Sequence, residues 1–253
     1  MTAPDYNDLV LESMHELRYF NQRLKNLSEQ LSMALNVDKI GTNSPINIKA
    51  SQADQVRVVA EGILNLSQLF TTRLDFIDVE LNENAIEHLP IQKVNIYGKF
   101  DKARKMLNAL SREKKVKVHI EGDHLQRRVF DAYSIIDILP YLLLDNAVKY
   151  SPERSDVYVE FAYYSDSTKI EICSSGPFVG ADEINKISNK NYRGRNAIKK
   201  QTCVGRGLGL YFVKYIADLH DISIKYESEK YSYEVDGIPY STFKVTLSVP
   251  WGT

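Results

Sequence analysis

The sequence lacks several features that mark secreted, membrane-spanning or fibrous proteins. Only two of its 253 residues are cysteine, Cys173 and Cys203. Neither lies at metal-ligand spacing, and such sparse cysteine usage is typical of a reducing cytosol. No apolar run reaches the roughly 20 residues that a bilayer-spanning helix needs, and the first residues show no signal-peptide pattern. We therefore expect a cytoplasmic protein with no membrane contact within this chain.

An excess of one charge is also missing. The 32 Lys and Arg residues nearly cancel the 33 Asp and Glu residues, and the formal net charge is −1. A nucleic-acid-binding surface usually shows as an excess of positive charge, so we expect no nucleic-acid partner. Low-complexity Gly, Ser or Pro tracts are absent too, and the length allows one large or two ordinary domains.

Residues 1–88 carry the periodicity of two long helices. From about Tyr6 to Leu35 the chain contains neither Gly nor Pro, and after a loop with Gly41 and Pro45 a second helix is predicted from Gln52 to Asn84. Apolar residues recur every seven positions in both, at Val10, Leu17, Leu24 and Leu31 and at Val56, Ile63, Phe70 and Ile77. One such antiparallel hairpin exposes more apolar surface than it covers, so we expect a homodimer that forms a four-helix bundle.

Beyond residue 88 the pattern changes to alternating strands and helices. Segments rich in β-branched and aromatic residues predict strands at 115–122, 155–164, 167–175, 222–228 and 241–250. Helices are predicted at about 94–111, 126–150 and 207–219. The fold class is therefore α+β and multidomain: the helical hairpin in residues 1–88, then an α/β sandwich in residues 89–253 with a mixed sheet and helices on one face.

Three glycines in "CVGRGLGLYFVKYI" lie where a loop becomes a helix: Gly205, Gly207 and Gly209. Glycines let the backbone approach a ligand closely, and a helix N-terminus presents free N–H groups to phosphate. No strand leads directly into the segment, so it is not a dinucleotide fingerprint. The alternative is a glycine-rich cap on a packed helix.

The segment "LLLDNAVKYSP" ends a predicted apolar helix. Asn146 offers a neutral oxygen suited to Mg²⁺, Lys149 shares its helix face and suits a phosphate, and Tyr150 offers an aromatic face for a purine. The alternative is an ordinary helix C-terminus, where Lys149 favours the helix dipole before a terminating Ser-Pro. Pro140 is expected to kink this helix or to mark its effective start.

Two further segments have both a functional and an ordinary interpretation. The predicted strand in "KIEICSSGPFV" runs into Gly176 and Pro177, which form either a binding loop or a simple turn. The basic stretch "NYRGRNAIKK" is either a solvated loop or a mobile segment that brings Arg193 or Arg195 to a triphosphate.

In this order the segments resemble the kinase core of sensor histidine kinases. "LLLDNAVKYSP" is similar to the asparagine box of that family, "IEICSSGPFV" to its first glycine box, "INKISNKNYRG" to its lid and "VGRGLGLYFVKYIADLH" to its second glycine box. Upstream, "HELR" is similar to the phosphoacceptor box. The resemblance covers nearly the whole chain. It implies a dimerisation and histidine phosphotransfer domain in residues 1–88 and an ATP-binding domain of the Bergerat (GHKL) type in residues 89–253.

The resemblance also implies roles for individual residues. His15 would accept the phosphoryl group, Glu16 would help remove its proton, and Arg18 would steady the transferring group. Asn146 would hold Mg²⁺. The implied nucleotide-binding residues are Asn146, Lys149, Tyr150, Ser174, Gly176, Arg193, Gly205, Gly207, Gly209 and Leu210. The implied cofactors are ATP and Mg²⁺, and the implied partner is the receiver domain of a response regulator.

The helix periodicity predicts that His15 is not a core histidine. A heptad wheel places His15 nearly opposite the Val10, Leu17 and Leu24 seam, so we expect it on an accessible face. Neutral imidazole is a nucleophile near neutral pH because its pKa is about 6.5. The implied function is a two-component signalling kinase that phosphorylates His15, either as a cytoplasmic protein or as the soluble part of a membrane-anchored sensor.

Several positions depart from the family pattern. Ser174 stands where the family usually has an adenine-binding Asp, and Phe178 replaces a later glycine of the same box. Leu142 occupies the place where related ATPases carry a water-activating Glu, which disfavours simple ATP hydrolysis. Tyr19 replaces a residue implicated in the family's phosphatase activity. These departures leave an alternative: a dimeric adaptor or phosphotransfer protein with a degenerate, weakly ATP-binding kinase domain.

Overall fold

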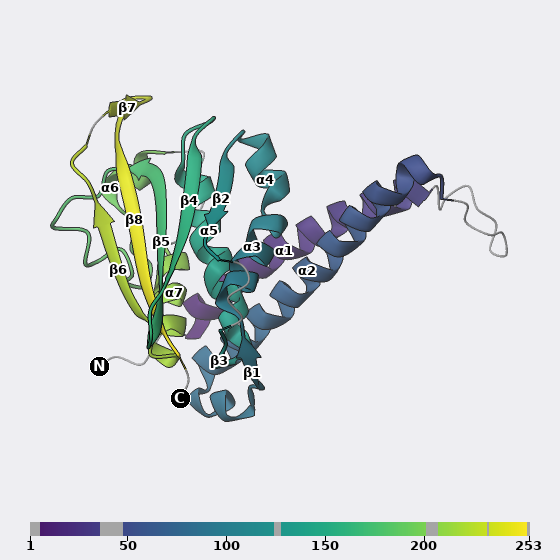
Figure 1. Cartoon of the computed structure of the whole chain (residues 1–253), viewed down its shortest axis with the longest axis horizontal. Helices are drawn as coiled ribbons and strands as arrows, with labels where there is room; N and C mark the ends of the chain where they lie inside the picture. The colour runs from purple at the N-terminus through teal and green to yellow at the C-terminus, as the bar shows by residue number, and fades with distance from the viewer. Residues whose placement is uncertain (1–5, 36–47, 124–127, 201–206, 232, 252–253) are drawn as a thin grey trace. The chain divides into compact units, whose positions relative to one another are not determined.

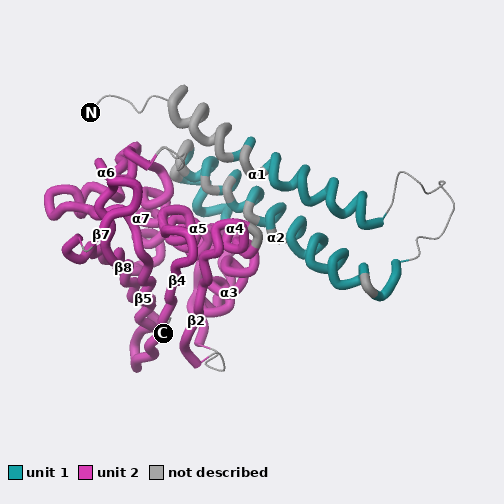
Figure 2. Tube along the Cα trace, turned by 90° about the horizontal axis from the view of Figure 1, so that it is seen from above, with its two compact units in different colours: residues 1–89 teal, residues 90–253 magenta. Residues whose placement is uncertain are grey.

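The computed structural model describes residues 6–35, 48–123, 128–200, 207–231 and 233–251. The chain divides into two compact units, Met1–Leu89 and Pro90–Thr253, which Figure 2 shows in different colours. The division falls one residue after the boundary expected from the sequence. Among the described residues, no helix is both long enough and apolar enough to cross a bilayer.

The first unit is a pair of long antiparallel helices that lie side by side in both views (Figures 1 and 2). They are α1 (Tyr6–Leu35) and α2 (Ala50–Leu81), followed by a 3-10 helix, η2 (Glu83–His88). A Cβ atom on Gly62 of α2 would lie 3.3 Å from Cδ1 of Leu27, so the helices approach closely there. The two helices predicted from the seven-residue repeat are confirmed; the second ends at Leu81 rather than at Asn84.

The second unit is built on a mixed sheet in the strand order β2-β4-β5-β8-β6, with β7 beside β8. The strands are β2 (Lys117–Glu121), β4 (Asp156–Tyr163), β5 (Ser167–Pro177), β6 (Ser223–Ser228), β7 (Tyr233–Val235) and β8 (Ile238–Pro250). The β2–β4 pair is parallel and the other pairs are antiparallel. All five predicted strands are present, and β7 was not predicted.

Helices cover one face of this sheet (Figure 1). They are α3 (Ile96–Met106), α4 (Asn108–Glu113), α5 (Ile138–Tyr150) and α7 (Gly209–Leu219). Burial alternates along β4, where Val157, Val159 and Phe161 are buried and the residues between them are exposed. This two-residue period is typical of a sheet with one covered face. The predicted α+β class, with helices on one face of a mixed sheet, is confirmed.

The helix predicted over residues 126–150 is wrong in its first part. Phe130–Tyr133 forms strand β3, which pairs antiparallel with β1 (Ile91–Val94) in a separate two-stranded sheet. A 3-10 helix, η3 (Ser134–Asp137), leads into α5. Pro140 is the third residue of α5, where its missing N–H group breaks no helical hydrogen bond. Its predicted place at the effective start of the helix is confirmed.

Candidate functional site

Helices α5 and α7 bring two of the predicted motifs together. Asn146 lies in the second half of α5 with its side chain half-exposed, and Gly209 is the first residue of α7. A Cβ atom on Gly209 would lie 3.3 Å from Nδ2 of Asn146, so the glycine backbone faces the amide directly. A larger residue at position 209 would press on the amide of Asn146, which is the side chain predicted to hold the cation.

Gly207 occupies a position that only glycine tolerates. Its φ is +81°, and a Cβ atom there would lie 2.7 Å from the carbonyl carbon of Tyr192. The chain therefore crosses tightly over the backbone of Tyr192 just before α7 begins. Leu208 is buried at this crossing and Leu210 is half-buried. Gly205 lies outside the described residues.

The C-terminus of α5 is capped by lysines from other parts of the chain. The Nζ atom of Lys114 donates to the carbonyl oxygens of Val148 at 2.8 Å and Lys149 at 2.7 Å. The Nζ atom of Lys200 donates to the carbonyl oxygen of Tyr150 at 2.9 Å. Lys149 itself lies in the last turn of α5, as the ordinary interpretation expects, so Lys114 and Lys200 add two more ammonium groups at the negative end of the helix dipole.

Lys149 and Tyr150 lie next to each other at the surface of α5. The Nζ atom of Lys149 is 5.6 Å from the centroid of the Tyr150 ring, and both residues are half-exposed. A cation beside an aromatic ring offers a place for an anionic group next to a flat apolar face. The arrangement fits the phosphate and adenine contacts that the family resemblance implies.

The first glycine box lies within strand β5 and not at its turn. Gly176 and Pro177 pair with Ser241 and Tyr240 of β8, so this pair forms neither the binding loop nor the simple turn expected from the sequence. Ser174 lies two residues earlier, on the helix-covered side of β5, and is 8% exposed. Its hydroxyl therefore belongs to the interior side of the sheet, where the expected adenine contact would lie.

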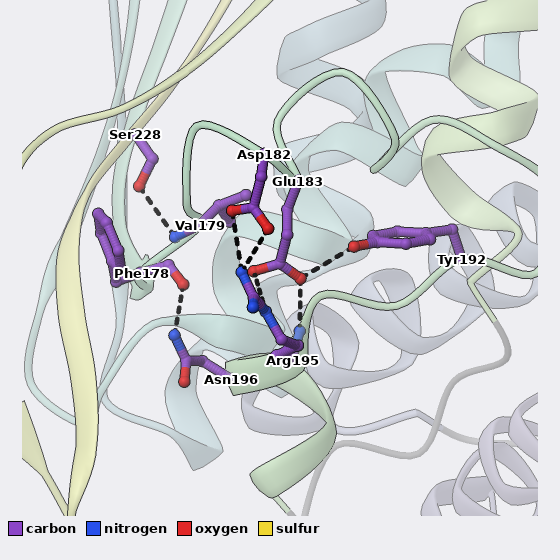
Figure 3. Close-up of polar contacts among 8 residues, drawn as sticks. All are labelled: Phe178, Val179, Asp182, Glu183, Tyr192, Arg195, Asn196 and Ser228. Carbon is purple, nitrogen blue, oxygen red and sulfur yellow. Dashed lines mark hydrogen bonds and ion pairs between the residues drawn. The ribbon is translucent and has the colours of Figure 1, made fainter.

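Figure 3 shows how the segment that follows β5 is held against residues 192–196. The N–H group of Phe178 donates to the carbonyl oxygen of Pro239 at 2.8 Å, which extends the pairing with β8 by one residue. The carbonyl oxygen of Phe178 accepts a bond of 2.7 Å from Nδ2 of Asn196, which lies in the short helix α6 (Arg195–Lys199). These two hydrogen bonds fix the backbone at Phe178, the residue that stands in place of the family's glycine.

The two arginines of the basic stretch differ in their contacts. Nη2 of Arg195 forms two bonds with Asp182, at 2.9 and 2.8 Å, and Nε lies 3.1 Å from Oε2 of Glu183. Arg193 is half-exposed and donates from Nη2 to the carbonyl oxygen of Ala197 at 3.2 Å. Arg195 is thus held by two carboxylates.

Sequence reasoning missed the acidic partners and the anchors of this region. Asp182, Glu183 and Asn196 follow no periodic pattern, and Lys114 lies in a run of charged residues that predicts only a solvated turn. One usable signal was present: an adjacent acidic pair, "DE", stands about ten residues before the basic "YRGR". Such a spacing permits an ion pair but does not select one.

The predicted phosphotransfer residues lie in α1. His15 and Glu16 belong to this helix, but their side chains, like that of Tyr19, lie outside the described residues. Arg18 is exposed. Among the side chains that the structure describes, no group of three or more His, Cys, Asp or Glu residues gathers as a metal site.

Comparison with known proteins identifies the class of the second unit. Residues 141–250 match the family described as "Histidine kinase-, DNA gyrase B-, and HSP90-like ATPase". The structure is similar to the crystal structure of full-length ShkA in complex with AMPPNP, with a TM-score of 0.55 and 16% identity over 94% of this chain and 46% of that chain. At this identity the likeness supports the fold alone.

Curated relatives then narrow the class to sensor histidine kinases. The chain is 25% identical over 227 residues to the sensor histidine kinase HprS of Escherichia coli (strain K12), which is 86% of this chain and 48% of HprS. It is 34% identical over 92 residues to the sensor protein QseC of the same strain, which is 36% of this chain and 19% of QseC. The chain thus spans about half the length of HprS, and its match to QseC covers a smaller share of that relative. The resemblance to sensor histidine kinases is confirmed.

Proposed function

We propose that the second unit binds ATP with Mg²⁺ and that the chain transfers the γ-phosphoryl group of ATP to His15. An aspartate of a response-regulator receiver domain would then accept that group. The observation that carries the proposal is the contact between Gly209 and Asn146, because it joins the two motifs expected to meet at the phosphates and the cation. Neither motif alone would be specific.

The residues around this contact fit a nucleotide in the following way. Asn146 would supply one oxygen to Mg²⁺, which when bound neutralises phosphate charge and usually takes few protein ligands. Lys149 would bind phosphate and Tyr150 would face the adenine. Arg193 would reach the γ-phosphate after leaving the carbonyl oxygen of Ala197. Ser174, Gly176, Gly205, Gly207 and Leu210 complete the proposed nucleotide-binding set.

The proposed chemistry needs a reachable imidazole in its neutral form. A ring nitrogen of His15 would bond to the γ-phosphorus while the bond from that phosphorus to the bridging oxygen of ADP breaks. Glu16 would take the imidazole proton, and Arg18, which is exposed on α1, would offset charge on the phosphoryl oxygens. The phosphoryl group would thus be transferred intact to His15, and ADP would be released.

We further propose that residues 1–88 dimerise and that residues 89–253 form the catalytic domain. Exposed apolar side chains on α2 support dimerisation, since Val58 is 57% exposed and Leu64 is 59% exposed in a single copy of the unit. A second hairpin packed on this one would cover such residues. The cytoplasmic location expected from the sequence remains a prediction.

Labelled ATP provides the direct test of this proposal. The protein is incubated with γ-labelled ATP and Mg²⁺, and we expect an acid-labile, base-stable label that disappears in His15→Ala. Asn146→Ala should abolish labelling while His15→Ala still binds nucleotide. Label that persists in His15→Ala would contradict the assignment of the acceptor.

A second candidate function rests on three residues of the nucleotide region. Ser174 lacks the charge of the family's Asp, Phe178 replaces a glycine, and Leu142 cannot activate water. These favour a dimeric adaptor with a degenerate kinase domain. Calorimetry with a non-hydrolysable ATP analogue separates the two functions, because the adaptor predicts no binding at millimolar ligand.

A further inference from the structure

Glu183 is a buried carboxylate that the proposed chemistry does not use. Its side chain is 4% exposed, and among the side chains that the structure describes it is the one buried acid. Burying a charge is costly unless donors surround it, and removing one partner of a buried charge is more costly still. A carboxylate kept in such a place needs a structural reason.

Three donors satisfy this carboxylate (Figure 3). The hydroxyl of Tyr192 donates to Oε1 at 2.9 Å, and the backbone N–H of Arg195 donates to the same oxygen at 2.8 Å. The guanidinium Nε of Arg195 lies 3.1 Å from Oε2. Burial alone would raise the pKa of Glu183, but these bonds and the charge of Arg195 lower it overall. The carboxylate is therefore charged at neutral pH and acts only as an acceptor.

Tyr192 connects this carboxylate with the candidate nucleotide site. Its hydroxyl is bound to Glu183, while its backbone lies directly beneath Gly207, where a Cβ atom would be 2.8 Å from the Tyr192 nitrogen. Two residues beyond this crossing, Gly209 faces the amide of Asn146. A displacement of Tyr192 would therefore change how closely the start of α7 approaches Asn146.

We propose that Glu183 is a positioning residue for nucleotide binding, which acts through Tyr192 on Gly207 and hence on the approach of Gly209 to Asn146. This inference rests on the proposed nucleotide binding. Asp182 has a lesser part, because its bonds to Arg195 lie at the surface, where the Asp182 side chain is 66% exposed and ion pairs contribute little.

The test uses the full chain, Mg²⁺ and AMPPNP as the probe, with calorimetry giving both the Kd and the number of binding sites. Tyr192→Phe removes only the hydroxyl bond to Glu183, and Glu183→Gln removes the charge. The control is Glu171→Gln on β5, because Glu171 also pairs with two cations, Lys169 at 3.3 Å and Lys244 at 3.5 Å, but on the uncovered face of the sheet.

We expect Tyr192→Phe to raise the Kd about fivefold, and Glu183→Gln to raise it about tenfold or more, as the loss of hydrogen bonds to a charged group implies. The number of sites should stay the same in both, and Glu171→Gln should match the wild type. A merely structural role would instead reduce the number of competent sites and leave the Kd unchanged.

An unchanged Kd in Tyr192→Phe would overturn the proposal, even if Glu183→Gln fails to fold. A rise of equal size in Glu171→Gln would also overturn it, since the effect would then not be specific to this position. Absence of binding by the wild type would instead reject the proposed function itself, and this inference with it, so the two failures are distinguishable.

Discussion

His220 accepts a hydrogen bond of 3.0 Å at Nε2 from the backbone N–H of Tyr133, and so joins the end of α7 to strand β3. Because Nε2 accepts, Nδ1 must carry the proton and donate to the carbonyl oxygen of Ile216, 2.7 Å away. The ring is buried at 8% exposure. Protonation would place an N–H group against the N–H group of Tyr133 and break this connection.

The pH dependence of stability should therefore carry a contribution from His220. Burial lowers the pKa of His220, outweighing the bond to Ile216 and the charge of Asp221. A lowered histidine pKa stabilises the fold above the unfolded pKa of about 6.5, and this stability is lost as the pH falls from there toward the folded pKa, by at most about 1.4 kcal/mol per pH unit.

Denaturant unfolding between pH 8 and pH 5 measures this contribution. His220→Gln is the matched variant, since an amide can accept from Tyr133 and donate to Ile216 without titrating. We expect the variant to lose less stability than the wild type over this range. Equal losses in both proteins would show that His220 does not titrate on unfolding.

Gly207→Ala should destabilise the protein more than Gly237→Ala. Both glycines have a positive φ, +81° and +72°, so both substitutions carry a similar backbone strain of about 1 kcal/mol. Among the residues that the structure describes, nothing lies within 4 Å of a Cβ at Gly237, whereas one at Gly207 meets the backbone of Tyr192. Thermal unfolding should give a clearly lower Tm for Gly207→Ala, and equal Tm values would contradict the close crossing.

Lys114→Met should lower the stability of the second unit by about 2 kcal/mol, the usual scale for hydrogen bonds to a charged group. The methionine keeps the apolar stem but leaves the carbonyl oxygens of Val148 and Lys149 without the ammonium donor. Lys225→Met is the control, because Lys225 is 69% exposed and pairs only with Glu227 among the described contacts. Chemical denaturation of both variants checks the difference.

Ser174→Asp should tighten nucleotide binding if Ser174 faces the adenine amino group. A carboxylate accepts a stronger hydrogen bond than a hydroxyl, and a gain of about 1 kcal/mol corresponds to roughly a fivefold lower Kd. GTP should gain nothing, because guanine presents a carbonyl oxygen where adenine has its amino group. Calorimetry with both nucleotides checks this, and a tighter GTP complex would contradict the predicted orientation. Ser174→Asn controls for side-chain size without the charge.

Much of the fold follows from local periodicity. The helix Tyr6–Leu35 is bounded correctly because its seven-residue apolar repeat runs uninterrupted by Gly or Pro. The strand predicted at 155–164 is observed at Asp156–Tyr163, because the buried face of a half-covered sheet imposes a two-residue period. In both, the signal repeats several times within one segment.

The missed elements lack such repetition. Strands β1 and β3 contain four residues each, so an alternating pattern of apolar and polar residues can repeat only twice in each. The apolar run through η3 and α5, which follows β3, made a single long helix the simpler interpretation. Similarly, the pairing of Glu183 with Arg195 joins residues twelve positions apart in an irregular region. Only the three-dimensional path selects it.

The two-stranded sheet of β1 and β3 determines at which residue a truncated protein that contains only the second unit can begin. The carbonyl oxygen of Pro90 accepts a hydrogen bond of 3.0 Å from the N–H of Ser134, so pairing begins at the first residue of the unit. A shortened protein that starts at Pro90 keeps β1, whereas one that starts at Ile96 leaves β3 with an open edge. Open strand edges recruit strands from other molecules, so the shorter version should aggregate during purification.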